Sequence, residues 1–214
     1  MDKNLHDYRK SYEKGSLTED TVLENPLKQF ATWFVDAEKT PTVEEPNAMT
    51  LSTVDTQGVP KARVVLLKEF TQEGFVFYTN YTSGKAQAIA QNNKVCISFF
   101  WPSLERQIII TGMAVKISEE KSIAYFNKRP RESQLGALVS DQSTSIDSRE
   151  ALEEKLLDLE KQYQTKPIVK PAHWGGYLIQ PTSYEFWQGR SSRLHDRIKY
   201  TKINNSWNIG RLQP

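Results

Sequence analysis

Glu185-Phe-Trp-Gln-Gly-Arg-Ser-Ser-Arg-Leu-His-Asp-Arg197 places two aromatic residues before a Gly/Ser turn and a basic cluster after it. If the second half is extended, Arg193, His195 and Arg197 share one face, because side chains alternate along a strand. Asp196 then points to the other face. A planar arginine fork beside a titratable imidazole suits a planar anion. The alternative is a solvated edge strand whose charges face water.

Further extended segments and turn signals surround this stretch along the whole chain. The sequence predicts strands over 48–54, 60–67, 74–79, 94–101, 108–117, 177–180, 183–188, 196–203 and 207–211, with turns at 55–58 and 204–205. The run 108–117 is so rich in Ile and Val that we expect a central strand buried on both faces. No Gly-x-Gly-x-x-Gly follows a strand, which argues against a Rossmann site. A mostly antiparallel barrel with peripheral helices fits best.

Helix signals fall between these strands. Asn25-Pro26 reads as an N-cap and first residue, and the stripe of Leu27, Phe30, Ala31 and Phe34 predicts a helix to about Glu38. More helices are expected: one capped by Ser83, one opening at Ser118 and ending at Pro130, which can start the next, and one with the capping box 147–150 that runs to about Tyr163. We expect a loop over 134–145 and a linker over 167–173.

Composition narrows the class of protein. A chain of 214 residues, 38% hydrophobic and 25% charged, fits one globular domain over 1–214, with residues 1–24 as a mobile N-terminal arm. A net charge of +2 is too balanced to suggest a nucleic-acid binder. No apolar run is long enough to span a membrane, and no signal peptide is evident. The single cysteine, Cys96, excludes an internal disulfide and suits the cytoplasm, and the histidines show no metal-ligand spacing.

The C-terminal motifs also carry a resemblance. Glu185-Phe-Trp-Gln-Gly189, Arg193-Leu-His-Asp-Arg197 and Arg211-Leu-Gln-Pro214 resemble the signature of the pyridoxine (pyridoxamine) 5'-phosphate oxidase family, and the likeness runs from about Tyr8 to the last residue. It implies an FMN-binding split β-barrel of Greek-key, mostly antiparallel topology. It also implies a homodimer with FMN in the interface, which oxidises pyridoxamine or pyridoxine 5'-phosphate to pyridoxal 5'-phosphate with O2 and releases hydrogen peroxide.

The segment Thr79–Lys85 suits a phosphate from its residues alone, because a strand, a turn and a helix N-terminus bring backbone N–H groups together. Most capped helices bind no phosphate, so this signal is weak by itself. The resemblance implies FMN contacts by Arg63, Val64, Val65, Leu66, Lys68, Tyr78, Thr79, Lys85, Gln107, Gln142, Ser143, Trp187 and Arg197. Gly84 departs from the family, which usually has arginine there, so one phosphate contact is missing.

A second anion site is expected near a helix junction. Tyr125 and Arg129 are four residues apart and share a helix face, and Pro130 brings Ser133 close. A solvent-exposed surface arginine is the alternative. The resemblance assigns these residues, with Lys68, to the phosphate of the substrate.

The remaining substrate contacts come from the resemblance. It assigns Arg193 and His195 to the pyridine ring as catalytic residues, and it gives Arg9 and Tyr12 a role in a lid. Arg63 and Lys68 are five residues apart, so they reach one ligand only if the strand bulges or ends near Lys68.

Two functions remain open from the sequence. The first is an FMN-dependent oxidase. The second is a non-catalytic split-barrel protein that binds flavin or pyridoxal phosphate as a carrier or sensor, and Gly84 is the feature that keeps it open. We expect no metal, no nucleic acid and no membrane among its partners.

Overall fold

The computed structural model describes residues 3–214, which divide into two compact units. Unit 1 combines the described residues up to Thr50 with Cys96–Gly112 and Pro181–Pro214, and unit 2 combines Leu51–Val95 and Met113–Gln180. The expectation of one domain with a mobile arm stays a prediction, and Met1 and Asp2 of that arm lie outside the described residues. No helix in residues 3–214 is long and apolar enough to cross a membrane.

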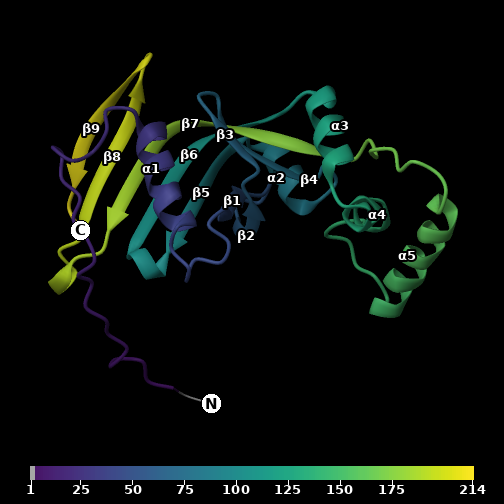
Figure 1. Ribbon diagram of the computed structural model, residues 1–214, viewed down its shortest axis with the longest axis horizontal. Coiled ribbons are helices and arrows are strands. Elements are labelled where there is room, and N and C mark those ends of the chain that lie inside the picture. Colours follow the sequence, from purple (N-terminus) through teal and green to yellow (C-terminus); the bar gives the residue numbers. More distant parts are fainter. Residues whose placement is uncertain (1–2) are drawn as a thin grey trace. The chain divides into compact units, whose positions relative to one another are not determined.

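The strands form one hydrogen-bonded sheet in the order β2-β1-β5-β6-β7-β4-β3, and β8 pairs with both β7 and β9 (Figure 1). Their bounds are β1 Ala48–Val54, β2 Pro60–Leu66, β3 Glu69–Thr71, β4 Gly74–Asn80, β5 Lys94–Trp101, β6 Arg106–Lys116, β7 Trp174–Gln188, β8 Asp196–Ile203 and β9 Ser206–Leu212. The pairs β3–β4, β4–β7, β7–β8 and β8–β9 are all antiparallel. The predicted fold class, mainly β and mostly antiparallel with peripheral helices, is confirmed.

Strand β7 corrects the prediction of two separate strands around Pro181. Its residues 174–179 pair with β4, and its residues 183–188 pair with β8. Pro181 falls between these two ladders, where its missing N–H removes no bond to either partner. The short strand β3 had no signal in the sequence, because three residues are too few for a periodic pattern.

Strand β6 is not buried on both faces, contrary to the prediction. Ile108, Ile110 and Ala114 are buried, whereas Met113 is 41% and Val115 is 36% exposed. The alternation means that one face of the strand packs on a core and the other does not. A run of β-branched residues therefore indicated the strand correctly but not its surroundings.

The core of unit 1 forms under α1, Pro26–Glu38. Asn25 caps the helix by accepting hydrogen bonds from the backbone N–H groups of residues 27 and 28, as its sequence predicts. Phe30 and Trp33 are buried and meet Phe99 and Phe186 edge-on, each pair with ring centroids 5.2 Å apart. Burying each such side chain stabilises the fold by about 1.5–3 kcal/mol. The prediction missed Trp33, whereas the predicted Phe34 is half-buried and meets Trp101 of β5 with ring centroids 6.3 Å apart.

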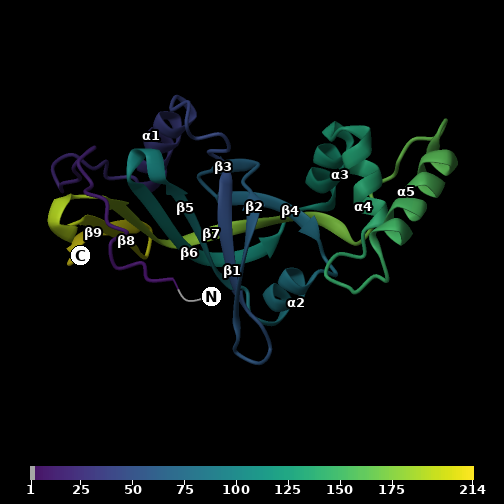
Figure 2. The same ribbon diagram turned by 90° about the horizontal axis from the view of Figure 1, so that it is seen from below.

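Unit 2 carries the other helices, α2 Gly84–Gln91, α3 Glu119–Lys128, α4 Arg131–Val139 and α5 Arg149–Tyr163. Helices α3, α4 and α5 lie together (Figure 2), and their core contains Phe126, Leu135, Ile168 and Trp174. The loop predicted over 134–145 is wrong in its first half, because α4 continues to Val139 and buries Leu135. Helix α5 is capped by Ser148, which accepts from Ala151 N, one residue later than the predicted capping box.

Candidate functional site

A cavity of about 950 Å³ in unit 2 is strongly basic. Its lining includes five cationic side chains, Lys61, Arg63, Lys68, Lys85 and Arg129, and no acidic one. Of these five, only Lys61 forms an ion pair with a carboxylate of residues 3–214. Its partner is Asp55, at 3.0 Å. A cavity of this size and charge is suited to an anionic organic ligand.

One end of the cavity is formed where β4 leads into α2. The ammonium of Lys85 donates to Thr79 Oγ1 at 3.1 Å, to Ser83 Oγ at 3.3 Å and to Gln142 Oε1 at 2.8 Å. Burial, together with the charge of Arg63, lowers the pKa of Lys85 to about 8. An anion bound here would favour the charged form of this lysine.

The start of α2 offers backbone donors at the same end. Ser83 occupies the N-cap position, but its hydroxyl donates to Asn80 O at 2.7 Å and does not cap the helix as predicted. The N–H groups of the first helical turn therefore have no side-chain acceptor at their cap. Uncapped N–H groups and the helix dipole both favour a phosphate at this position.

The other cationic group of the cavity lies at the junction of α3 and α4. Helix α3 ends at Lys128, Arg129 is extended, and α4 begins after Pro130, so that Tyr125, Arg129 and Ser133 line the same cavity as predicted. Lys68 also lines this cavity. Its position five residues after Arg63 required the strand to bulge or end near Lys68, and β2 does end at Leu66.

Arg129 carries a buried donor without a partner. Within residues 3–214, its Nη1 atom has no acceptor to which it donates a hydrogen bond. Its guanidinium lies 4.7 Å from the ring centroid of Trp174, and burial lowers its pKa. An unsatisfied buried charged donor is costly, so its position points to a ligand anion that would satisfy it.

Trp174 holds this arginine and was missed by the sequence reading. Its ring stacks on Tyr78 with centroids 5.3 Å apart, and Tyr78 in turn stacks on Tyr125 at 4.0 Å. Trp174 follows the predicted linker, and nothing in the neighbouring sequence indicates that it packs against the helix junction at Arg129, much earlier in the chain.

A second, smaller cavity of about 370 Å³ lies in unit 1. It is lined by Tyr8, Arg9, Lys10, Ser11, Tyr12, Arg190, Ser192, Arg193 and His195. The rings of Tyr12 and Trp187 flank His195, with centroids 5.7 Å and 4.8 Å from the imidazole. The sequence-predicted residues Arg9, Tyr12, Arg193 and His195 are thus brought together.

The geometry of the basic segment differs from the predicted strand. Ser191–Arg193 forms a 3₁₀ turn in which Ser192 and Arg193 have φ of 54° and 61°, and β8 begins at Asp196, as the predicted strand over 196–203 does. Arg193, His195 and Arg197 would share one face only in an extended segment, and the turn means that this condition is not met. Arg197 pairs with Glu185 at 2.7 Å and donates to Gln213 O, whereas the other two line the cavity.

The residues predicted to contact FMN are divided between the two units. Ten of them line the unit 2 cavity: Arg63, Val64, Val65, Leu66, Lys68, Tyr78, Thr79, Lys85, Gln142 and Ser143. The other three belong to unit 1, where Gln107 lies near the start of β6, Trp187 lies in β7 and Arg197 lies in β8. Their roles stay predictions.

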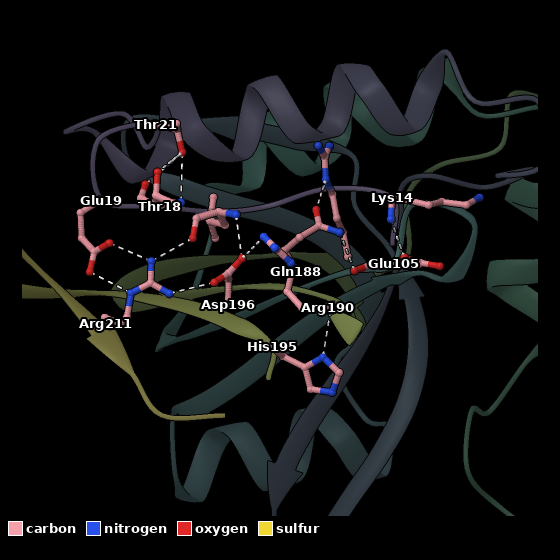
Figure 3. Close-up of polar contacts among 12 residues, drawn as sticks. Lys14, Thr18, Glu19, Thr21, Glu105, Gln188, Arg190, His195, Asp196 and Arg211 are labelled. Carbon is pink, nitrogen blue, oxygen red and sulfur yellow. Dashed lines mark hydrogen bonds and ion pairs between the residues drawn. The ribbon is translucent and has the colours of Figure 1, made fainter. Parts of the chain in front are cut away.

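Two carboxylates of unit 1, those of Glu105 and Asp196, were also missed (Figure 3). Glu105 has φ of 55° and is buried, and its carboxylate accepts the backbone N–H groups of Glu13 and Lys14 at 2.8 Å and 3.0 Å. Asp196 joins Arg190 and Arg211. Asp196 stands inside the motif that opened the sequence analysis, but alternation had assigned it to the opposite face. The N-terminal segment from Glu13 onward is thus hydrogen-bonded within unit 1.

Comparisons with known proteins agree over both units. Residues 35–163 match the family described as pyridoxamine 5'-phosphate oxidase, and residues 174–214 match the pyridoxine 5'-phosphate oxidase C-terminal dimerisation region. A protein of Christiangramia forsetii named pyridoxine/pyridoxamine 5'-phosphate oxidase is 55% identical over 214 residues, 100% of both chains. One of the same name from Trichormus variabilis is 48% identical over 215 residues, again 100% of both.

Solved structures share the architecture. PhzG from Burkholderia lata, determined with tetrahydrophenazine-1-carboxylic acid, superposes with a TM-score of 0.85 at 28% identity, covering 91% of this chain and 95% of that one. A pyridoxamine 5'-phosphate oxidase-related, FMN-binding protein of Nostoc punctiforme has a TM-score of 0.70 at 18% identity, over 89% and 98% of the two chains, and supports the fold alone. The predicted split-barrel fold is confirmed.

Proposed function

The chain belongs to the pyridoxamine 5'-phosphate oxidase family, and from this premise we propose that it oxidises pyridoxamine or pyridoxine 5'-phosphate to pyridoxal 5'-phosphate with FMN as cofactor and O2 as acceptor. The full-length identity to proteins of that name supports the activity. The observation that supports placing this activity in the large cavity is its lining, which has no acidic residue and includes the buried Arg129 Nη1 atom without a hydrogen-bond partner in residues 3–214.

The residues of the large cavity fit FMN. Lys85, Arg63, Gln142 and Ser143 would hold its phosphate beside the uncapped start of α2. Bound FMN would supply the redox chemistry by accepting a hydride equivalent from the substrate and passing the electrons to oxygen. The protein supplies position and positive charge at this end of the cavity. Gln107, Trp187 and Arg197 would complete the contacts to the flavin.

The substrate would be held by two groups of residues. Lys68, Tyr125, Arg129 and Ser133 would bind its phosphate, which supplies the acceptor that Arg129 Nη1 lacks. Arg193 would pack against the pyridine ring and His195 would hydrogen-bond its polar groups, while Arg9 and Tyr12 cover it. Fixing both ends of a small substrate orients its reacting carbon, and orientation accounts for much of enzymatic rate enhancement.

The protein is a homodimer in this proposal, with FMN in the interface. The match of residues 174–214 to a dimerisation region supports the assembly. The half-buried, unpaired thiol of Cys96 suits the reducing cytoplasm, where we place the enzyme. The second candidate, a non-catalytic carrier of flavin or pyridoxal phosphate, has no observation that favours it over the oxidase.

Anaerobic reduction distinguishes an oxidase from a carrier. Purified protein saturated with FMN should be yellow, and pyridoxamine 5'-phosphate should bleach it without oxygen, after which air should restore the colour and produce peroxide. A yellow protein that the substrate does not bleach would establish the carrier. A protein with no saturable quenching of FMN fluorescence would sink the cofactor assignment as well.

Gly84→Arg should tighten FMN binding. An added β-carbon at Gly84 meets Ser143 at 3.9 Å, an ordinary contact, so the larger side chain can be accommodated beside Lys85. One new charge-assisted hydrogen bond contributes about 1.5–3 kcal/mol, so Kd should fall roughly 10-fold or more. FMN fluorescence titration at two salt concentrations measures this, with Gly84→Gln as the uncharged control. Equal affinity in all three proteins would show that another residue already fills this role.

A further inference from the structure

Asp196 collects hydrogen bonds from three separate segments of unit 1 (Figure 3). Its Oδ2 accepts from Leu17 N at 3.0 Å and from Arg190 Nη1 at 3.1 Å, and its Oδ1 accepts from Arg211 Nη1 at 2.9 Å. Burial acts to raise the pKa of Asp196, but these hydrogen bonds and the two arginine charges outweigh it and lower the pKa overall. The carboxylate is therefore charged at neutral pH, and each bond to it is charge-assisted.

Arg190 connects this carboxylate to His195. While its guanidinium pairs with Asp196, its backbone N–H donates to His195 Nδ1 at 3.1 Å. A ring nitrogen that accepts from an N–H carries no proton, so the neutral imidazole holds its proton on Nε2. The hydrogen bond at one nitrogen thus decides what the other can offer to a ligand.

The segment between these residues is under strain. Ser192 and Arg193 both lie in the left-handed region, with φ of 54° and 61°. Residues other than glycine occupy this region at a cost and remain there only when the surroundings hold them. The Arg190–Asp196 ion pair joins the residue before the turn to the first residue of β8, and Leu194 N donates to Ser191 O across the turn at 3.1 Å.

We propose that Arg190 is a positioning residue that sets the tautomer of His195 and holds the strained turn that presents Arg193 to the cavity. This inference rests on the proposed roles of Arg193 and His195 in substrate binding. His195 Nε2–H would then act as a fixed donor toward an acceptor atom of the substrate. Arg190 acts through these two residues, because its own guanidinium is engaged by Asp196.

The tautomer can be measured without turnover. Histidine ¹⁵N resonances of the full-length protein, with and without FMN, should show an unprotonated Nδ1 and a protonated Nε2 for His195, identified by its loss in His195→Gln. In Arg190→Ala the two shifts should move toward each other as the tautomers mix. The chain has only three histidines, so the spectrum is simple.

Kinetics form the second readout. Arg190→Ala should lower kcat/KM about 10- to 100-fold, the loss that a small misplacement of substrate can cause. Arg190→Lys retains a charge for Asp196 and should recover part of both readouts. Arg149→Ala removes a matched but exposed arginine, which pairs with Glu153 at 2.7 Å on α5, and should leave both unchanged.

Several results would overturn the inference. A protonated Nδ1 in the native protein contradicts it directly. So do native His195 shifts and native kcat/KM in a folded Arg190→Ala protein. If Arg190→Ala fails to fold, Arg190→Gln, which keeps a polar side chain but loses the charge that pairs with Asp196, is subjected to the same two measurements, and native values in it would contradict the inference. A native protein with the expected tautomer but no oxidase activity would instead count against the proposed function.

Discussion

Arg193→Ala should lower kcat/KM for pyridoxine 5'-phosphate about 100-fold, because the substrate would lose the fork that orients it and misplacement alone can cost that factor. Arg193→Lys should be nearly as damaging, because a lysine retains the charge but not the planar geometry. The affinity for FMN should barely change, since the residues proposed to hold its phosphate line the other cavity. Steady-state kinetics and flavin fluorescence titration on each variant measure both quantities.

The controls are Glu153→Ala and Lys161→Ala on the exposed side of α5, which should be neutral. Full turnover by Arg193→Ala would restore the alternative in which the basic segment is only solvated, even if the protein binds FMN. Equal losses of turnover and FMN affinity would indicate a structural defect and not a loss of substrate contact.

Arg129→Leu should raise KM for the phosphorylated substrate roughly 10- to 100-fold. The arginine presents a donor without a partner within the described chain, and a hydrogen bond from a charged group to phosphate contributes about 1.5–3 kcal/mol. Stability should stay the same or rise, because leucine relieves a buried, unsatisfied charged donor. Kinetics and thermal melts of the substrate-free protein test the two halves of this expectation.

Substrate without a phosphate provides the internal control. Pyridoxamine lacks the group that Arg129 is proposed to bind, so its turnover should be the same in the native protein and in Arg129→Leu. Arg131→Leu is the matched variant, since Arg131 is close in sequence but donates to Tyr163 O and does not line the cavity. A rise in KM that is equal for both substrates would contradict a phosphate contact by Arg129.

Local signals predicted the elements well. The bounds of α1 follow from the Asn25-Pro26 cap and those of β5 from a short apolar run ended by Pro102, and both match the structure. The junction at Pro130 brought Tyr125, Arg129 and Ser133 together because helix spacing and proline chemistry act over a few residues.

Features that depend on distant partners were not predictable in this way. The conformation of Arg193 is set by a turn that Asp196 closes, and Asp196 is itself held by Leu17 and Arg211 from opposite ends of the chain. The alternation of side chains along a strand cannot predict these contacts between distant parts of the chain. Trp174 likewise owes its place beside Arg129 to stacking on Tyr78, almost a hundred residues earlier.

The way unit 1 is assembled from the chain bears on its biosynthesis. Arg211 donates to Leu17 O at 3.0 Å and pairs with Glu19 at 2.7 Å, so two early residues are bonded to a residue that is translated almost two hundred residues later. Unit 2 is made of residues up to Gln180, whereas unit 1 also includes Pro181–Pro214. On the ribosome, the segment around Leu17 therefore lacks its partner Arg211 until these later residues have been made, and during that interval it is exposed to proteases and chaperones.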